Sequence, residues 1–134
     1  MERWLGPRGD LLYALMRFMT GVLFACHGAQ KLFGALGGTQ QTSNPKLLVA
    51  GLIEFFGGAL IALGLRASYA AFVASGQMAV AYFTVHAPGG FWPIINKGEL
   101  AVVYCFVFLY IASRGSGTLS LDQAMRRRPS GRQP

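Results

Sequence analysis

Charged residues are scarce in this sequence, and acidic residues are the scarcest. Only 13% of the 134 residues are charged, and five acidic residues stand against twelve lysines and arginines. An average soluble domain has roughly a quarter of its residues charged. Because 53% of the residues are hydrophobic, too few polar groups remain to cover a surface in water. The composition therefore excludes a soluble globular protein and indicates a membrane protein.

The sequence also lacks the motifs that hold redox cofactors and metal ions. It has two cysteines, Cys26 and Cys105, with no CxxC or CxxCH motif, and only two histidines. Iron–sulfur clusters are held by about four cysteines, and a dinucleotide site uses a GxGxxG turn. We therefore expect no metal site and no covalent cofactor, and we interpret the cysteines as small hydrophobic residues. Without a redox centre of its own, the chain is expected to be an accessory subunit rather than an enzyme alone.

What the sequence does contain is four long stretches almost free of charge. They cover residues 11–33, 47–65, 67–87 and 100–113. A helix that crosses the hydrocarbon core needs about 20 residues, and the last stretch reaches this length only with Gly98, Glu99 and Arg114. Because the stretches are apolar or small on every side, they are typical of membrane helices. We predict an all-α polytopic membrane protein, with a four-transmembrane-helix bundle in residues 1–122 and a basic tail in residues 123–134.

The basic residues indicate how the helices are oriented. Eight flank the predicted helices on the side of the termini: Arg3, Arg8, Arg66 and the five arginines from 114 to 132. Three lie on the other side: Lys31, Lys46 and Lys97. Lysine and arginine accumulate in cytoplasmic segments, so both termini are predicted to be cytoplasmic. The basic tail is expected to contact anionic lipids, and no aromatic-interleaved basic surface supports nucleic acid as a partner.

Glu54 is the most informative residue inside the predicted membrane helices. It lies about 12 Å from the outer end of its helix, at 1.5 Å per residue, where an unpaired carboxylate costs at least a few kcal/mol. His27 and Lys31 project from one side of the first helix because they are spaced i, i+4. We expect them to face Glu54, with Glu99 and His86 nearby. The candidate residues for a proton or quinone site are His27, Lys31, Glu54, Glu99, Tyr82 and Tyr104.

Simpler interpretations of these polar residues stay open. A pair of Glu54 and Lys31 can serve only to fix how the helices pack, and solvation alone can explain His86 and Glu99. Arg17, inside the first helix, is interpreted as a structural residue or a contact to lipid headgroups. Gly21 and Gly28 in the first helix are predicted to let the backbone of another helix approach closely, and Gly51 and Gly58 make a similar stripe in the second helix.

The connection between the third and fourth helices is unusually apolar. Phe91, Trp92 and Pro93 are followed by Ile94 and Ile95. Prolines reduce the entropy lost on ordering, and tryptophan suits the headgroup layer. We predict an ordered lid over the outer mouth or an interface to a partner, with a plain interfacial anchor as the alternative.

Four motifs in this order resemble the DoxX family of small four-helix bacterial and archaeal membrane proteins. They are RFMTGVLFACHGAQKLFG, EFFGGALIALGLRA, APGGFWPIINKGELAVVY and GSGTLSLD, and the resemblance spans residues 11–122. Members are associated with quinone-linked oxidoreductase assemblies. The resemblance therefore implies a membrane subunit of a larger redox complex in a bacterial or archaeal cytoplasmic (inner) membrane. Its expected partners are other subunits, and its expected ligand is a quinone or a bound lipid.

A different class of function is also compatible with an intramembrane carboxylate. A stand-alone, proton-coupled transporter or permeability protein would use Glu54 as its coupling site. Transporters often build their sites from discontinuous helices, and the sequence shows no broken midplane segment, which weighs against this alternative.

Overall fold

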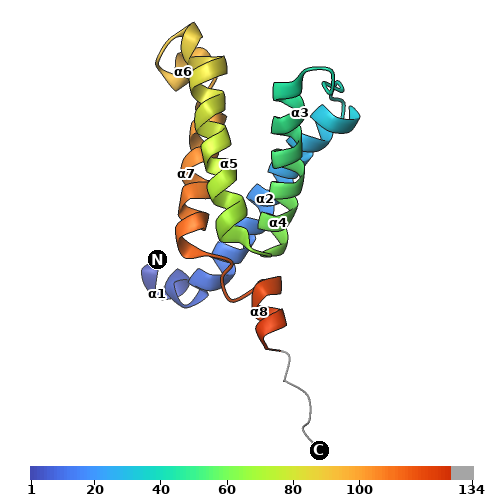
Figure 1. The fold of residues 1–134 in the computed structure, drawn as a ribbon. Coiled ribbons are helices and arrows are strands. Elements are labelled where there is room, and N and C mark those ends of the chain that lie inside the picture. The colour runs from blue at the N-terminus through green and yellow to red at the C-terminus, as the bar shows by residue number, and fades with distance from the viewer. Residues whose placement is uncertain (128–134) are drawn as a thin grey trace, which may run out of the picture.

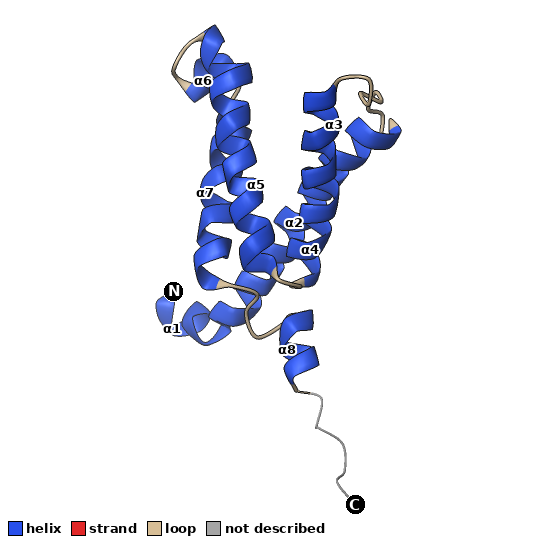
Figure 2. Cartoon of the chain, viewed as in Figure 1, coloured by secondary structure: helices blue, strands red, loops and turns tan. Residues whose placement is uncertain are grey.

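The structure is a computed structural model that describes residues 1–127, and within this range every regular element is helical. Figure 2 shows helices joined by short loops without a strand in the described part. The all-α prediction is therefore confirmed. Residues 128–134, most of the predicted basic tail, lie outside the described residues.

The first predicted span is a single long helix. A short helix, α1 (Glu2–Leu5), and a 3-10 turn lead into α2 (Gly9–Phe33). The helix stops where Gly34 adopts a left-handed conformation (φ 65°) and its N–H donates to the Gln30 carbonyl. A glycine at this position ends many helices because it has no Cβ to clash.

The second predicted span is helical throughout but has an interruption in its middle. It consists of α3 (Pro45–Leu52), a π-helical turn (Ile53–Gly57) and α4 (Gly58–Leu63). The start is set by Asn44, whose side chain accepts a hydrogen bond from the Lys46 N–H at 3.0 Å, with proline at the first helical position. Both features are favoured at helix N-termini.

The second half of the chain forms the other two long helical segments. α5 (Ala67–Ala81) continues into a second π-helical turn (Tyr82–His86) and a 3-10 turn (Ala87–Gly89). The short α6 (Pro93–Asn96) precedes α7 (Glu99–Arg114), and α8 (Leu121–Arg126) follows a loop. The domain boundary predicted at residue 122 therefore falls inside α8.

The helices pack as two pairs. α2 lies along α3, the π-turn and α4, while α5 lies along α7. Figure 1 shows the pairs close together at the α4–α5 turn and diverging toward α3 and α6. α1 and α8 lie at the end with the α4–α5 turn, which we call the terminal end; the end with α6 and the α2–α3 connection is the loop end.

Aromatic side chains join the two pairs in the core. Phe24 of α2 packs against Phe108 and Tyr104 of α7, with ring centroids 4.6 and 5.5 Å apart. By contrast, large apolar side chains such as Phe72, Phe83 and Phe106 are exposed on the outside. An apolar exterior of this extent indicates contact with something other than water.

Glycines bring α2 and the second helical segment into backbone contact, as the sequence predicts. A Cβ placed on Gly28 would lie 2.3 Å from the Phe55 backbone N, and one on Gly58 would lie 2.5 Å from the Ala25 backbone N. Such distances leave no room for any side chain. The prediction of close approach through small residues is confirmed.

By length and composition, two helices within residues 1–127 are able to cross a membrane: Glu2–Phe33 and Pro45–Leu63. α7 has 16 residues, fewer than the roughly 20 that a perpendicular span needs.

Candidate functional site

Glu54 lies on the π-helical turn between α3 and α4, and its side chain is only 2% exposed. A π-turn fits one extra residue into a helical turn at the expense of regular hydrogen bonding, and such turns are frequent at functional sites. An ionisable group buried among apolar helices therefore coincides with a local irregularity of the backbone.

Three helical segments converge on one oxygen of this carboxylate. Lys31 of α2 forms an ion pair with Glu54 Oε1, as the sequence predicts. Gln77 of α5 donates from Nε2 to the same oxygen at 2.9 Å, and its Nε2 also lies 3.4 Å from the Ala50 carbonyl oxygen. The Lys31 side chain keeps 28% of its surface exposed, so the buried carboxylate is connected to the protein surface through one ammonium group.

Two other acceptors in this cluster have no hydrogen-bond partner among the described residues. They are Glu54 Oε2 and Gln77 Oε1, both buried. An unpaired buried acceptor costs about 1–3 kcal/mol, so such atoms are normally paired. A hydroxyl or N–H of a ligand, or a proton on Glu54, would supply the missing donor.

The structure does not bring His27 to Glu54. His27 is exposed, and its ring lies edge-on to Tyr104 of α7, with centroids 6.4 Å apart. The i, i+4 spacing places His27 and Lys31 on one side of α2, but the flexible lysine chain reaches the π-turn while the short imidazole stays at α7. Tyr104 is buried and stacks on Phe108.

Glu99 and His86 also lie apart from Glu54. Glu99 opens α7 and is exposed, and neither of the two ion pairs in residues 1–127 includes it. A carboxylate in the first turn of a helix is favoured by the helix dipole. His86 Nδ1 lies 3.2 Å from the Asn96 carbonyl oxygen. The expected outward constellation of five groups is thus corrected to a cluster of Lys31, Glu54 and Gln77.

The segment after α5 is folded, as a lid would be, but its contacts are local. The Tyr82 hydroxyl donates to the Phe91 carbonyl, so this candidate for binding a ligand carbonyl is already engaged. Asn96 donates from Nδ2 to the Gly90 carbonyl at 2.6 Å and accepts from the Gly98 N–H at 2.8 Å. Figure 1 shows α6 on the α5–α7 pair, away from α3.

The apolar side chains of this segment point outward. Phe91, Trp92, Ile94 and Ile95 are between 65% and 76% exposed, and Pro93 begins α6. None of the described hydrogen bonds or ion pairs joins them to Lys31 or Glu54. The arrangement therefore caps α5 and α7 and presents an apolar surface, in agreement with the alternative of an interfacial anchor.

Arg17 is the second buried charge, and its partners are backbone carbonyls. It is 2% exposed. One terminal nitrogen donates to the carbonyls of Ile61 and Ala62 at the end of α4, and the other donates to the Leu119 carbonyl at 2.7 Å. These contacts cap the C-terminus of α4 and hold the loop after α7. They support the structural interpretation of Arg17.

Asp122 completes the terminal end. Its Oδ2 accepts a hydrogen bond from the Ser116 hydroxyl at 2.6 Å and another from the Arg66 N–H at 2.9 Å. These two bonds, the Ser116 bond above all, lower the pKa of the Asp122 carboxyl below its ordinary value of 3.8. The sequence alone assigns no role to Gln77 or to Asp122. The signal for Gln77 was a lone amide on a face of small residues.

A helical bundle with an apolar exterior and two buried charges defines the class: an all-helical membrane protein. Its sequence matches the DoxX family over residues 12–87, which contain Lys31, Glu54 and Gln77. The chain belongs to the DoxX family. The matched range ends at Ala87, the first residue of the third of the four motifs that carried the resemblance.

A protein of Haemophilus influenzae is similar over most of both chains. It is 41% identical over 116 residues, which cover 81% of this chain and 87% of the relative, and it is described only as an uncharacterized protein. No solved structure matches this chain.

Proposed function

We propose that this protein is a four-helix integral membrane subunit of a larger membrane redox complex, and that its Lys31–Glu54–Gln77 cluster exchanges protons with a quinone headgroup. The observation that carries the proposal is that Glu54 and Gln77, which are joined by a hydrogen bond, each keep a buried oxygen without a described partner, Oε2 and Oε1 respectively. Two acceptors without donors fit a ligand that brings hydroxyl groups, as a reduced quinone does.

The roles of the three residues follow from their contacts. Lys31 forms an ion pair with Glu54 and, being partly exposed, links it to the surface. Gln77 holds Oε1 in place from α5 and leaves Oε2 to take a proton. A quinone, when bound, supplies the two-electron chemistry, and cofactor-bearing subunits exchange electrons with it, because this chain has no redox motif of its own.

The proposed architecture has four spans with both termini in the cytoplasm. α5 with its π-turn covers residues 67–86, which is long enough, and α7 gains length from flanking Gly98 and Gly115. Figure 1 places α1, the α4–α5 turn and α8 at the terminal end, and these elements carry Arg3, Arg66 and Arg126. Cysteine labelling at positions 43 and 130 in intact cells tests this topology; external labelling at 130 contradicts it.

Purification and substitution test the function. In mild detergent, we expect cofactor-bearing subunits to co-purify with the chain. Glu54→Gln keeps the shape and an acceptor but cannot carry the proton, so the complex should assemble and lose most of its quinone-dependent turnover. Glu54→Ala should also impair assembly, since it leaves the Lys31 ammonium without its partner. Glu99→Gln removes an exposed carboxylate and should behave as wild type.

Full turnover of Glu54→Gln would reduce the cluster to a packing element. Isolation of the chain without other subunits would contradict the redox complex itself.

One observation favours the second candidate, a proton-coupled transporter. The helix that bears Glu54 is interrupted by a π-turn, and the third helical segment ends in another. The sequence alone predicts no interrupted helix. Transporters place coupling residues on such interruptions. Proton-driven uptake by the isolated chain in liposomes, lost in Glu54→Gln, would establish this function instead.

A further inference from the structure

We propose that α5, α7 and the terminal end together form a binding site for one anionic phospholipid, with its phosphate among arginines and the upper part of an acyl chain in a groove. This site is separate from the Glu54 cluster. It rests on one part of the proposed function, that α5 and α7 span the membrane.

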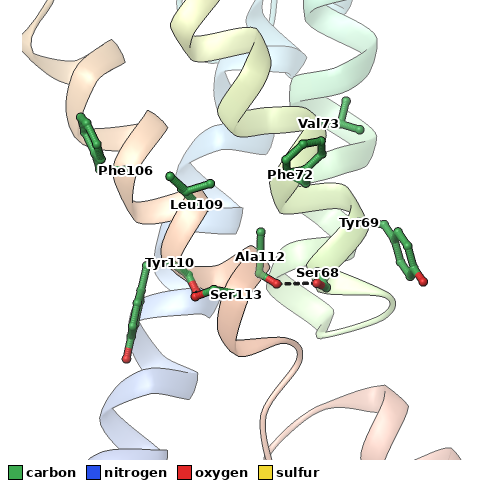
Figure 3. A pocket seen from close by; sticks show the side chains of 9 residues that line it. All are labelled: Ser68, Tyr69, Phe72, Val73, Phe106, Leu109, Tyr110, Ala112 and Ser113. Carbon is green, nitrogen blue, oxygen red and sulfur yellow. Dashed lines mark hydrogen bonds between the residues drawn. The ribbon is translucent and has the colours of Figure 1, made fainter.

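The groove lies between α5 and α7 on the outside of the bundle. It has a volume of about 770 Å³ and is lined mainly by apolar side chains, among them Phe72, Val73, Phe106 and Leu109. Figure 3 shows Phe106 and Leu109 on one helix facing the helix with Phe72, and a hydrogen bond from Ser68 to the Ala112 carbonyl across the helix pair. This bond already uses the Ser68 hydroxyl, so the groove suits a hydrocarbon chain.

The length of the groove matches part of one membrane leaflet. Its lining on α7 runs from Phe106 to Ser113, which is about 10 Å at 1.5 Å per residue. One leaflet contributes about 15 Å to the hydrocarbon core. The groove would therefore hold an acyl chain over roughly two thirds of the thickness of the leaflet, starting at the headgroup.

A second pocket of about 750 Å³ adjoins the groove at the terminal end. Both share Ser68 and Tyr69, so the apolar groove continues directly into it. Its lining includes three arginines, Arg66, Arg114 and Arg126, against one carboxylate, Asp122. The pocket therefore has a net positive charge at the level where headgroups lie.

The contacts within the pocket show which arginines are available to a ligand. Arg114 is held by Asp10 at 2.8 Å and by the Tyr110 hydroxyl at 2.9 Å. The guanidinium groups of Arg66 and Arg126 have no described hydrogen bond within residues 1–127. Asp122 is engaged by Ser116 and the Arg66 N–H, which leaves those two guanidinium groups to bind a phosphate.

An anionic phospholipid is the occupant that satisfies both parts at once. Basic pockets at the ends of membrane helices bind anionic headgroups, with about 1 kcal/mol for each arginine near the surface. A zwitterionic lipid would fill the groove without matching the charge. A free phosphate would match the charge without using the groove.

Titration of the delipidated full-length protein, followed by native mass spectrometry, separates these occupants. The probes are phosphatidylglycerol, phosphatidylcholine and inorganic phosphate. We expect the protein to bind one molecule of phosphatidylglycerol at low lipid concentration. The Arg66→Gln and Arg126→Gln variants should each bind this lipid about fivefold more weakly. The charge-matched control Lys46→Gln, at the loop end, should bind as wild type.

A second pair of variants tests the groove. Val73→Trp should fill it and weaken phosphatidylglycerol binding severalfold, while Val80→Trp, an equally exposed change on the same helix outside the groove lining, should not. Equal binding of the two lipids, phosphate binding as tight as the lipid, or unchanged binding in both arginine variants would overturn the site.

The proposed function and the lipid site are tested by different measurements. The lipid titration needs no partner subunit and should be unaffected by Glu54→Gln, whereas loss of quinone-dependent turnover in that variant says nothing about the lipid. Cysteine labelling at position 95, in the connection between α5 and α7, tests whether these two helices span. If position 95 is not labelled from outside intact cells, the four-span topology fails, and the lipid titration is then expected to fail with it.

Discussion

Arg17 and Glu54 are both 2% exposed, yet the protein surrounds them in different ways. The Arg17 guanidinium donates to three backbone carbonyls, whose positions are set by the ends of helices and which do not titrate. Glu54 is held through one oxygen by two side chains, Lys31 and Gln77, and its other oxygen has no described partner. The first arrangement fixes a structure, and the second leaves a reactive atom available.

The difference teaches how to separate a structural charge from a functional one. A buried charge costs several kcal/mol unless it is paired, and both residues meet that requirement. Each also keeps one buried atom without a described partner, Nε of Arg17 and Oε2 of Glu54. What differs is whether that atom can accept a proton and whether the partners can move or change protonation. By this measure, the functional interest lies at Glu54, although the arginine deep in the first helix is equally conspicuous in the sequence.

The largest expected effect comes from removing the structural charge. Arg17→Met keeps the apolar stem but leaves the carbonyls of Ile61, Ala62 and Leu119 without their donor. At about 1 kcal/mol or more for each buried acceptor, we expect about 3 kcal/mol of lost stability. Thermal unfolding in detergent measures it, with the exposed Lys46→Ala as control. A variant as stable as wild type would show that these contacts do not support the fold.

The next effect tests the contact surface that positions both charges. In Gly28→Ala, the new Cβ meets the backbone of Phe55 at 2.3 Å, so α2 and the π-turn must separate. Overpacking of this kind costs about 1–3 kcal/mol. Gly76→Ala on α5 is the matched control, because a Cβ there meets nothing within 4 Å. Equal unfolding temperatures for the two variants would contradict the backbone contact.

The smallest effect is a pH dependence confined to the terminal end. The pKa of Asp122 is lowered by its bonds from Ser116 and the Arg66 N–H. The ionised carboxylate therefore stabilises the folded protein above about pH 3.8. This contribution disappears as the pH falls through the lower pKa that Asp122 has in the folded protein. Asp122→Asn should therefore unfold at a lower temperature than wild type at pH 7. The difference should narrow below pH 3.8, and a constant difference would exclude the ionised carboxylate as its cause.

Much of the fold follows from the length of the hydrophobic stretches and from the glycines that end them. The predicted stretches 11–33 and 47–65 end within two residues of the ends of α2 and α4. Both helices end at a glycine that adopts a left-handed conformation, Gly34 and Gly64, and such glycines can be located in the sequence. The contacts of Gly21, Gly28 and Gly58 also followed from spacing, since residues three or four apart share one face of a helix.

The candidate site was predictable only in part. The Lys31–Glu54 pair follows from the cost of burying a carboxylate, but a period of 3.6 residues gives no sign of an extra residue in a π-turn. The direction of His27 depends on how α2 sits between its neighbours, and the role of Gln77 depends on α5 meeting that turn. The site at Asp122 needs residues 56 apart in the chain. Such contacts are tertiary and leave no local pattern.

The bond from Arg17 to Leu119 joins residues 102 apart, and this separation imposes an order on biosynthesis. Chains are folded as they are made, from the N-terminus onward. Arg17 can meet Ile61 and Ala62 once the second helical segment has been synthesised, but its third acceptor arrives only after residue 119 has left the ribosome. Tyr13 waits in the same way for the Gly115 carbonyl, and Asp10 for Arg114. The long helix α2 is thus made early in synthesis, but its tertiary contacts are complete only when the last part of the described chain has been made.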